Sequence, residues 1–235
     1  MRTAMIVMGL VGVLVVAVVV VVAGARLSGP TRTDGLAPAP VKRDTPVAQG
    51  APLPTGLDLV TWSRDTADRT RVPARALQAY AAAELSQRSA TPECRLSWTT
   101  VAAIGRVESD HGRLGRADLG SDGMARPPII GVRLDGSPGV AEIRDTDDGR
   151  LDGDPTHDRA VGPLQFLPAT WARYGRGGDP QNIDDAAKAA AAYLCARGRD
   201  TASGVGWWDG VLTYNRSVEY ARLVWAAANR YATVP

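Results

Sequence analysis

The hydrophobic and polar positions after Leu57 follow the spacing of amphipathic helices, with apolar residues recurring every three or four positions. Asn182 is placed to cap the helix that begins at Asp184, and Gly198 is placed to stop it. The predicted helices are Pro73–Gln87, Trp98–Asp110, Pro168–Tyr174, Asp184–Arg197, Trp207–Tyr214 and Ser217–Ala232.

The pattern changes between Gly112 and Gly162, where glycine, proline and aspartate become frequent. Two short runs in this region, Ile129–Leu134 and Val140–Ile143, have the composition of strands. We find no internal repeat. The sequence therefore predicts a mostly helical α+β domain with one small β insertion.

The first 26 residues contain a long apolar run. Ala4–Ala25 comprises 22 residues without a charge, and at a rise of about 1.5 Å per residue such a helix could cross a hydrocarbon core of about 30 Å. Ala23, Gly24 and Ala25 also have the small-residue pattern of a signal-peptide cleavage site. We interpret residues 1–26 as a transmembrane anchor, with a cleaved signal peptide as the alternative.

Residues 27–56 are rich in proline, glycine, threonine and alanine, a composition typical of a semi-extended linker. The segment 57–235 is long enough to bury a core and is interpreted as one domain. The chain as a whole is 45% hydrophobic and 22% charged, as in globular proteins. Its net charge of +2 gives no reason to expect nucleic acid as a partner.

The chain has two cysteines, Cys94 and Cys195. An even number of cysteines behind an export signal is typical of a disulfide formed outside the cytoplasm. Two buried free thiols are the alternative. We therefore expect the folded part to lie in the cell envelope, either anchored to the membrane or secreted.

Glu108 lies on the apolar face of the predicted helix Trp98–Asp110. At helical spacing, Val101 and Ile104 point to the same side as this carboxylate. Burial disfavours a charged carboxylate and raises its pKa, which suits a general acid near neutral pH. The alternative is a glutamate at the edge of the helix that reaches water.

Four motifs occur in a fixed order along the chain. They are VESDHG around Glu108, AVGPLQFLPATWARY at 160–174, AAAAYLC ending at Cys195, and YNRSVEY at 214–220. Together they resemble the lytic murein transglycosylases of the membrane-bound B type, in the subgroup found on actinobacterial cell surfaces. The resemblance covers roughly Leu57–Tyr231, and Cys94 and Cys195 also look like the cysteine pair of that subgroup.

The resemblance implies a lysozyme-like α+β fold and cleavage of the MurNAc–GlcNAc β-1,4 bond of peptidoglycan, leaving a 1,6-anhydro-MurNAc end. It implies that Glu108 is the single catalytic acid and base. Ordinary glycosidases use two carboxylates, whereas here the 6-hydroxyl of the sugar itself replaces water. The implied partners are peptidoglycan glycan strands and, through the N-terminal segment, the membrane; we expect a monomer without a cofactor.

The same motif matching implies substrate-binding roles for Gln165, Tyr193, Tyr214, Asn215 and Tyr220. Amides donate and accept hydrogen bonds, and aromatic faces pack against sugar rings, so these residue types suit a sugar cleft. Ordinary structural roles are the alternative, above all core packing for Tyr193 and Tyr220.

The acidic stretch Asp145–Asp158 raises the question of calcium. It fails the EF-hand spacing, because counting from Asp145 places Gly149 at the fifth position, and counting from Asp148 places arginines at the third and twelfth. The loop after Tyr174 is also shorter than in many of the similar proteins. We therefore expect no metal site, although the sequence leaves calcium in this loop open.

Two other functions remain open on the sequence. A muramidase-type hydrolase could use Asp145, Asp147 or Asp148 to activate water and would leave reducing MurNAc ends. The second is a cell-wall-binding module without catalysis. The presence of Glu108 in the VESDHG motif argues against this second function. The sequence does not distinguish cleavage within strands from cleavage at their ends.

Overall fold

The computed structural model describes residues 37–233. It is a mostly helical α+β structure, as the sequence predicts. The helices are α1 (Leu59–Thr70), α2 (Ala74–Ala90), α3 (Trp98–Ser109), α4 (Pro168–Tyr174), α5 (Ile183–Leu194), α6 (Gly204–Tyr214) and α7 (Val218–Ala232), with single 3-10 turns at Pro92–Cys94 and Ala196–Gly198. The strands are β1 (Asp118–Leu119), β2 (Ala125–Arg126), β3 (Ile130–Arg133) and β4 (Arg159–Val161).

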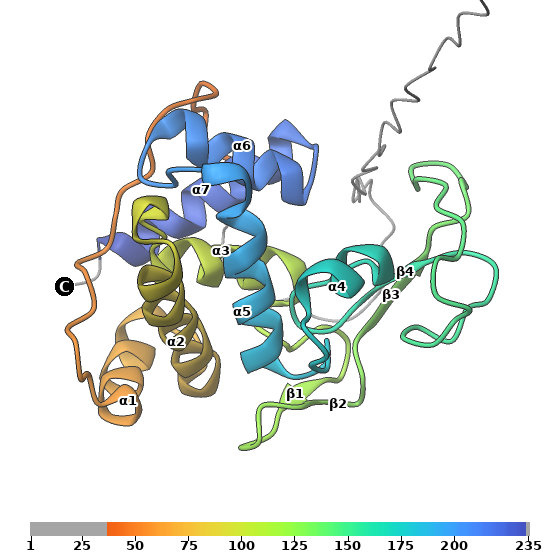
Figure 1. The fold of residues 1–235 in the computed structure, drawn as a ribbon, viewed down its shortest axis with the longest axis horizontal. Helices are drawn as coiled ribbons and strands as arrows, with labels where there is room; N and C mark the ends of the chain where they lie inside the picture. Colours follow the sequence, from red (N-terminus) through yellow and green to blue (C-terminus); the bar gives the residue numbers. More distant parts are fainter. Residues whose placement is uncertain (1–36, 234–235) are drawn as a thin grey trace, which may run out of the picture.

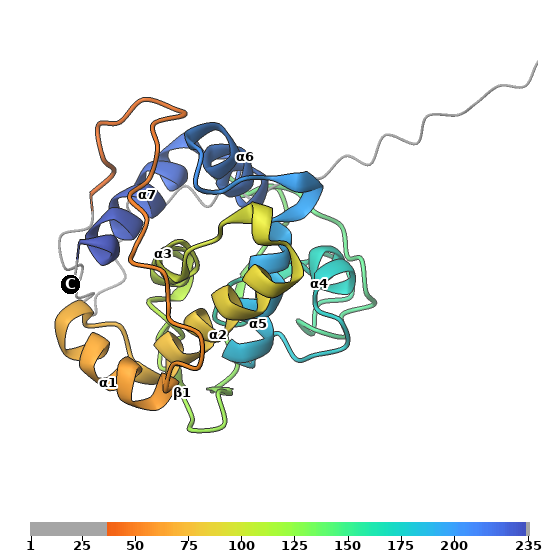
Figure 2. The ribbon, with the colours of Figure 1, turned by 60° about the vertical axis from the view of Figure 1, so that its left-hand side comes forward.

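Helix α3 lies in the middle of the helical part, and α2, α5, α6 and α7 surround it (Figure 1, Figure 2). The main packing partners are α2 with α5 and α3 with α7. The largest fully buried side chains in this core include Trp207, Trp208, Tyr80 and Ile104. The core therefore forms around the helix that carries Glu108.

Local sequence sets both ends of α3. Ser97 caps its first turn, since the Ser97 hydroxyl accepts a hydrogen bond from the backbone N–H of Thr99 at 3.3 Å. Three consecutive residues at its other end have positive φ: Asp110 at 51°, His111 at 62° and Gly112 at 88°. A helix cannot continue through left-handed residues, so α3 ends one residue after Glu108.

Gly105 allows α3 to approach α2 closely. A Cβ atom at this position would lie 2.2 Å from the hydroxyl oxygen of Tyr80. Any larger residue would push the two helices apart, because that tyrosine is fully buried. Gly105, three residues before Glu108, thus serves helix packing.

All six predicted helices are present, with ends shifted by a few residues. The helix α1 was not among them, because its sequence, LVTWSRDTADRT, is mostly polar. Asp58 caps it by accepting the backbone N–H of Val60 at 3.0 Å. Helix α5 ends at Leu194, before the predicted Arg197, which has a left-handed φ of 63°.

The β insertion consists of two antiparallel pairs, β1 with β2 and β3 with β4. The predicted strand at Ile129–Leu134 is confirmed as β3. The prediction of a strand at Val140–Ile143 is wrong, since this segment turns back within a loop and forms only an isolated bridge between Asp135 and Glu142. Two left-handed glycines, Gly136 and Gly139, produce that turn.

The predicted disulfide is confirmed, because Cys94 and Cys195 are bonded to each other, with their Cα atoms 5.5 Å apart. The bond joins the turn before α3 to the end of α5, across 101 residues of sequence. In the chain-entropy description, closing a loop of this length stabilises the fold by up to about 4.7 kcal/mol. The alternative of two buried free thiols is wrong.

The proline-rich segment is extended but is not a free linker where the structure describes it. Val47 is 4% exposed and Leu53 is 3% exposed. The indole N–H of Trp208 donates to the carbonyl of Thr45 at 3.0 Å, and that of Trp225 donates to the carbonyl of Pro46 at 3.2 Å. Figure 2 shows this segment, in orange, crossing the outside of the helices.

The predicted anchor or signal peptide at 1–26 lies outside the described residues. Within residues 37–233, no helix combines the length and the hydropathy that a membrane span requires. The location of the protein in the cell therefore stays a prediction.

The docking of the proline-rich segment predicts that Leu53→Ala destabilises the whole fold. Removing a buried leucine side chain costs about 2–5 kcal/mol, so the urea midpoint of the variant should fall clearly. Val60→Ala is the matched control, because Val60 is 46% exposed. An unchanged midpoint for Leu53→Ala would show that the segment contributes nothing to stability.

Candidate active site

Glu108 lies in the last turn of α3 and contacts a tyrosine from α7. The hydroxyl of Tyr220 donates a hydrogen bond of 2.6 Å to Oε1 of Glu108. Burial raises the pKa of Glu108 to about 7, and the hydrogen bond from Tyr220 opposes this rise. The residue keeps a partly exposed surface, so a proton on this carboxyl group can reach a ligand.

Tyr220 is held in place by the start of α7. Ser217 caps this helix, because its hydroxyl accepts the backbone N–H of Tyr220 at 3.2 Å. The tyrosine is 8% exposed, and burial and the nearby charge of Glu108 raise its pKa well above the ordinary value. Tyr220 therefore stays a hydrogen-bond donor to Glu108 at physiological pH.

A row of aromatic rings leads away from Glu108. The ring of Tyr214 lies 5.6 Å from that of Tyr193, and the ring of Tyr193 lies 4.7 Å from that of Tyr174. Burial raises the pKa of Tyr214, and the nearby charge of Glu108 raises it further. The row thus begins within electrostatic reach of the carboxylate.

The GPLQF segment forms a tight loop that supports this row. Gly162 has a φ of 77°, and a Cβ atom there would lie 1.8 Å from the carbonyl oxygen of Pro180. Only glycine fits at such a position. The carbonyl of Leu164 accepts a hydrogen bond of 2.6 Å from the hydroxyl of Tyr214, so the loop fixes the orientation of the tyrosine.

Ser109 ties the loop to the end of α3. Its hydroxyl donates to the carbonyl of Pro163 at 2.5 Å and accepts the backbone N–H of Gly112 at 2.7 Å. In the sequence, only the place of Ser109 beside Glu108 in the VESDHG motif could indicate such a role, and none was predicted for it. Ser109 is a positioning residue, since it holds the loop against the helix that carries Glu108.

The predicted site residues do not all have free side chains. Gln165 has a left-handed φ of 48°, and its amide donates to the carbonyl of Gly162 at 3.0 Å. The hydroxyl of Tyr193 donates to the carbonyl of Thr213 at 2.9 Å. Asn215 is 8% exposed, and its Oδ1 accepts the backbone N–H of Ser217 at 3.0 Å.

The structure therefore brings Tyr220 onto Glu108 and places Tyr214 and Tyr193 in one row beside it. Gln165 lies in the supporting loop, and Asn215 shapes the turn between α6 and α7. Substrate contacts by these five residues stay predictions.

His111 belongs to the core. Its Nδ1 lies 3.2 Å from the hydroxyl oxygen of Tyr80, and its Nε2 lies 3.1 Å from that of Tyr231. Burial, aided by two nearby arginines, holds the pKa of His111 well below its ordinary value, so the ring is neutral. The histidine links α2, the end of α3 and α7.

Three residues of the acidic loop could hold a divalent cation. Asp145, Asp147 and Asp158 each place one carboxylate oxygen within 4.8 Å of the other two, and such oxygens are ligands for hard cations. Oδ1 of Asp147 is buried without a hydrogen-bond partner in the described chain. The expectation that the protein needs no metal stays a prediction.

Comparisons of the chain with protein-family models, with curated proteins and with solved structures found no match. The assignment of the site therefore depends on its own residues and on the four motifs.

The raised pKa of Glu108 predicts a specific pH dependence of stability. Between about pH 4.5 and pH 7 the folded protein keeps a proton on Glu108 that the unfolded chain has released, so the free energy of unfolding falls across this range. Glu108→Gln replaces the carboxyl group with an amide that does not titrate. The variant should therefore gain stability relative to the wild type as the pH rises.

The expected gain is on the order of 1–2 kcal/mol, after allowing for the partial exposure of the side chain. Urea unfolding of both proteins at pH 4.5 and pH 8 measures it. A difference between the two proteins that is the same at both pH values would show that Glu108 is not desolvated.

Proposed function

We propose that this protein is a peptidoglycan lytic transglycosylase with a lysozyme-like fold, which cleaves the MurNAc–GlcNAc β-1,4 bond and leaves 1,6-anhydro-MurNAc ends. The observation that carries the proposal is Glu108, a carboxyl group with a pKa near 7 that receives a hydrogen bond from Tyr220 and lies beside a row of tyrosines. The resemblance of the four motifs, in their order along the chain, indicates which glycosidic bond is cleaved.

In the first step Glu108 acts as the general acid. Oε1 is engaged by Tyr220, and Oε2 has no hydrogen-bond partner within residues 37–233, so Oε2 delivers the proton. The proton goes to the glycosidic oxygen as the bond to the anomeric carbon breaks, and the GlcNAc hydroxyl leaves. A pKa near 7 keeps part of the enzyme protonated at neutral pH, as this step requires.

In the second step the Glu108 carboxylate acts as the base. It takes the proton from the 6-hydroxyl of MurNAc as that oxygen bonds to the anomeric carbon, which closes the anhydro ring and restores the acid. The attack is intramolecular, and high effective molarity makes it competitive with attack by water. The charge that Glu108 gains in the first step is stabilised by the Tyr220 hydroxyl.

One carboxylate is enough for this sequence of steps, whereas a hydrolase of the usual kind needs two. In the described part of the chain, burial and Tyr220 are the causes that set the pKa of Glu108, and no second carboxylate is among them. This favours the transglycosylase over a muramidase that uses Asp145, Asp147 or Asp148. The proposed setting is the cell envelope, with glycan strands as the partner of a monomer that uses no cofactor.

Glu108→Gln should abolish cleavage of purified peptidoglycan, because the amide keeps the volume and the Tyr220 contact but cannot transfer a proton. The expected loss is at least about 10⁴-fold, the upper end for general acid–base catalysis. Release of soluble muropeptides from sacculi measures it. Glu93→Gln, at an exposed position in the turn before Cys94, is the matched control, and residual activity above about a tenth of wild type in Glu108→Gln would remove Glu108 from the mechanism.

The released muropeptides should carry anhydro ends and should appear equally in EDTA, since the proposed steps use only Glu108 and the sugar. Mass spectrometry distinguishes anhydro products from hydrolytic ones, which are heavier by one water. A product pool dominated by reducing ends would favour the muramidase. Loss of activity in EDTA that calcium restores would show that the acidic loop is required.

A further inference from the structure

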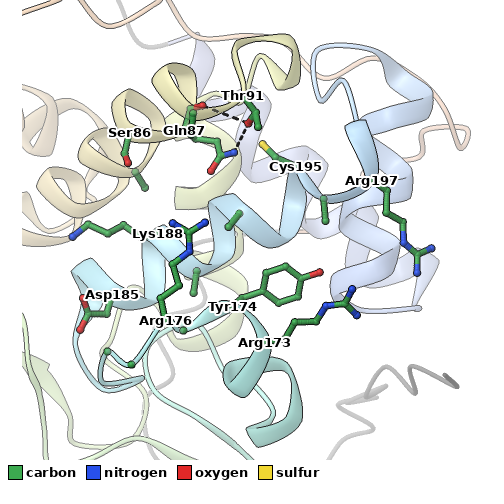
Figure 3. Close-up of a pocket in the computed structure, with 18 of the residues that line it drawn as sticks. Ser86, Gln87, Thr91, Arg173, Tyr174, Arg176, Asp185, Lys188, Cys195 and Arg197 are labelled. Atoms are coloured by element: carbon green, nitrogen blue, oxygen red, sulfur yellow. Dashed lines mark hydrogen bonds between the residues drawn. The ribbon is translucent and has the colours of Figure 1, made fainter.

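A large groove runs between α2, α5 and the end of α4 (Figure 3). It has a volume of about 940 Å³, and a second cavity of about 500 Å³ adjoins it. The two share Arg173, Tyr174 and Arg197 in their walls. The second cavity also reaches Tyr193, so the groove continues the aromatic row of the candidate active site.

The groove carries an excess of positive charge. Arg173, Arg176, Lys188 and Arg197 line it against one carboxylate, Asp185. All four cations are exposed, and within the described chain none of them forms an ion pair. Asp185 is occupied, since it accepts the backbone N–H of Asp179 at 3.0 Å.

The cations are spread along the groove and do not converge on one point. Figure 3 shows Lys188 and Arg176 over one end of α5 and Arg173 and Arg197 toward the other. Small side chains form much of the floor between them, with Ala83, Ala90, Ala189 and Ala192 among the lining residues. A narrow, extended ligand with several separated negative charges fits this arrangement.

We propose that this groove binds the peptide stem of the peptidoglycan strand, with Arg173 and Lys188 pairing with its carboxylates. The inference rests on the proposed function and names the part of the substrate that lies beyond the sugars. A stem peptide has short aliphatic side chains for the alanine floor and free carboxylates for the cations. The stem peptide is also attached to the glycan strand that would occupy the aromatic row.

The test compares two substrates, glycan strands that carry tetrapeptide stems and strands from which an amidase has removed the stems. The measured quantity is kcat/KM for strands with stems divided by kcat/KM for strands without stems. In the full-length protein, Arg173→Gln combined with Lys188→Gln should lower this ratio about ten-fold, because each exposed ion pair contributes up to about a five-fold effect. The charge-preserving pair Arg173→Lys and Lys188→Arg should restore most of the ratio. Arg64→Gln, an exposed arginine on α1, is the control.

A ratio that does not change, or that Arg64→Gln changes equally, would overturn the proposal. A direct measurement of peptide binding distinguishes failure of this proposal from failure of the proposed function. Calorimetry of the full-length protein with free tetrapeptide should show binding that the double glutamine variant weakens about ten-fold and that amidation of the peptide carboxylates removes. If the wild type cleaves neither substrate, the proposed function fails, and the calorimetry alone decides whether the groove binds the stem peptide. Absence of peptide binding, or equal binding of a poly(glycerol phosphate) oligomer, overturns the groove assignment.

Discussion

The close packing of α3 among its neighbours is the constraint on which the candidate site depends. Gly105 brings α3 against Tyr80 of α2, and α7 packs along the same helix. Because α3 is buried over its first turns and ends immediately after Glu108, the carboxylate leaves the core at its edge. That position removes enough water to raise the pKa of Glu108 and still leaves a route to a ligand.

The same packing sets which groups can meet the carboxylate. Helix α7 contributes Tyr220, whose hydroxyl has no charge and lies against Oε1. A neutral donor lowers the pKa of a carboxyl group less than a cation would, so Glu108 keeps a pKa near neutrality. Arg106, the cation two residues before Glu108 on α3, pairs instead with Asp110. The ion pair of Arg106 on α3 is thus kept apart from the Glu108 carboxyl group.

Local patterns in the sequence predict most of the helices but not the contacts between distant segments. Helices α3, α5 and α7 combine apolar residues with helical spacing. Helix α1 was not predicted because its sequence is mostly polar, and its buried residues are Ser63, Thr66 and Thr70. The bond from Ser109 to Pro163 joins residues 54 apart in sequence, and that from Tyr220 to Glu108 joins residues 112 apart. The resemblance assigned Glu108 and Tyr220 to one site but did not predict the hydrogen bond between them, and it did not predict the bond from Ser109 to Pro163. Val47 and Leu53 went unnoticed because single apolar residues among prolines have no period.

The docked proline-rich segment would also limit the distance between the folded part and a membrane anchor. If residues 1–26 are an anchor, a linker that ran freely to Gly56 would have 30 residues and a reach of about 100 Å at about 3.4 Å per residue. The backbone N–H of Ala39 already bonds to the carbonyl of Arg222 on α7, which leaves about 12 residues and a reach of about 40 Å. The folded part would then be confined to a layer close to the membrane, and the docking of this segment would set the depth of that layer.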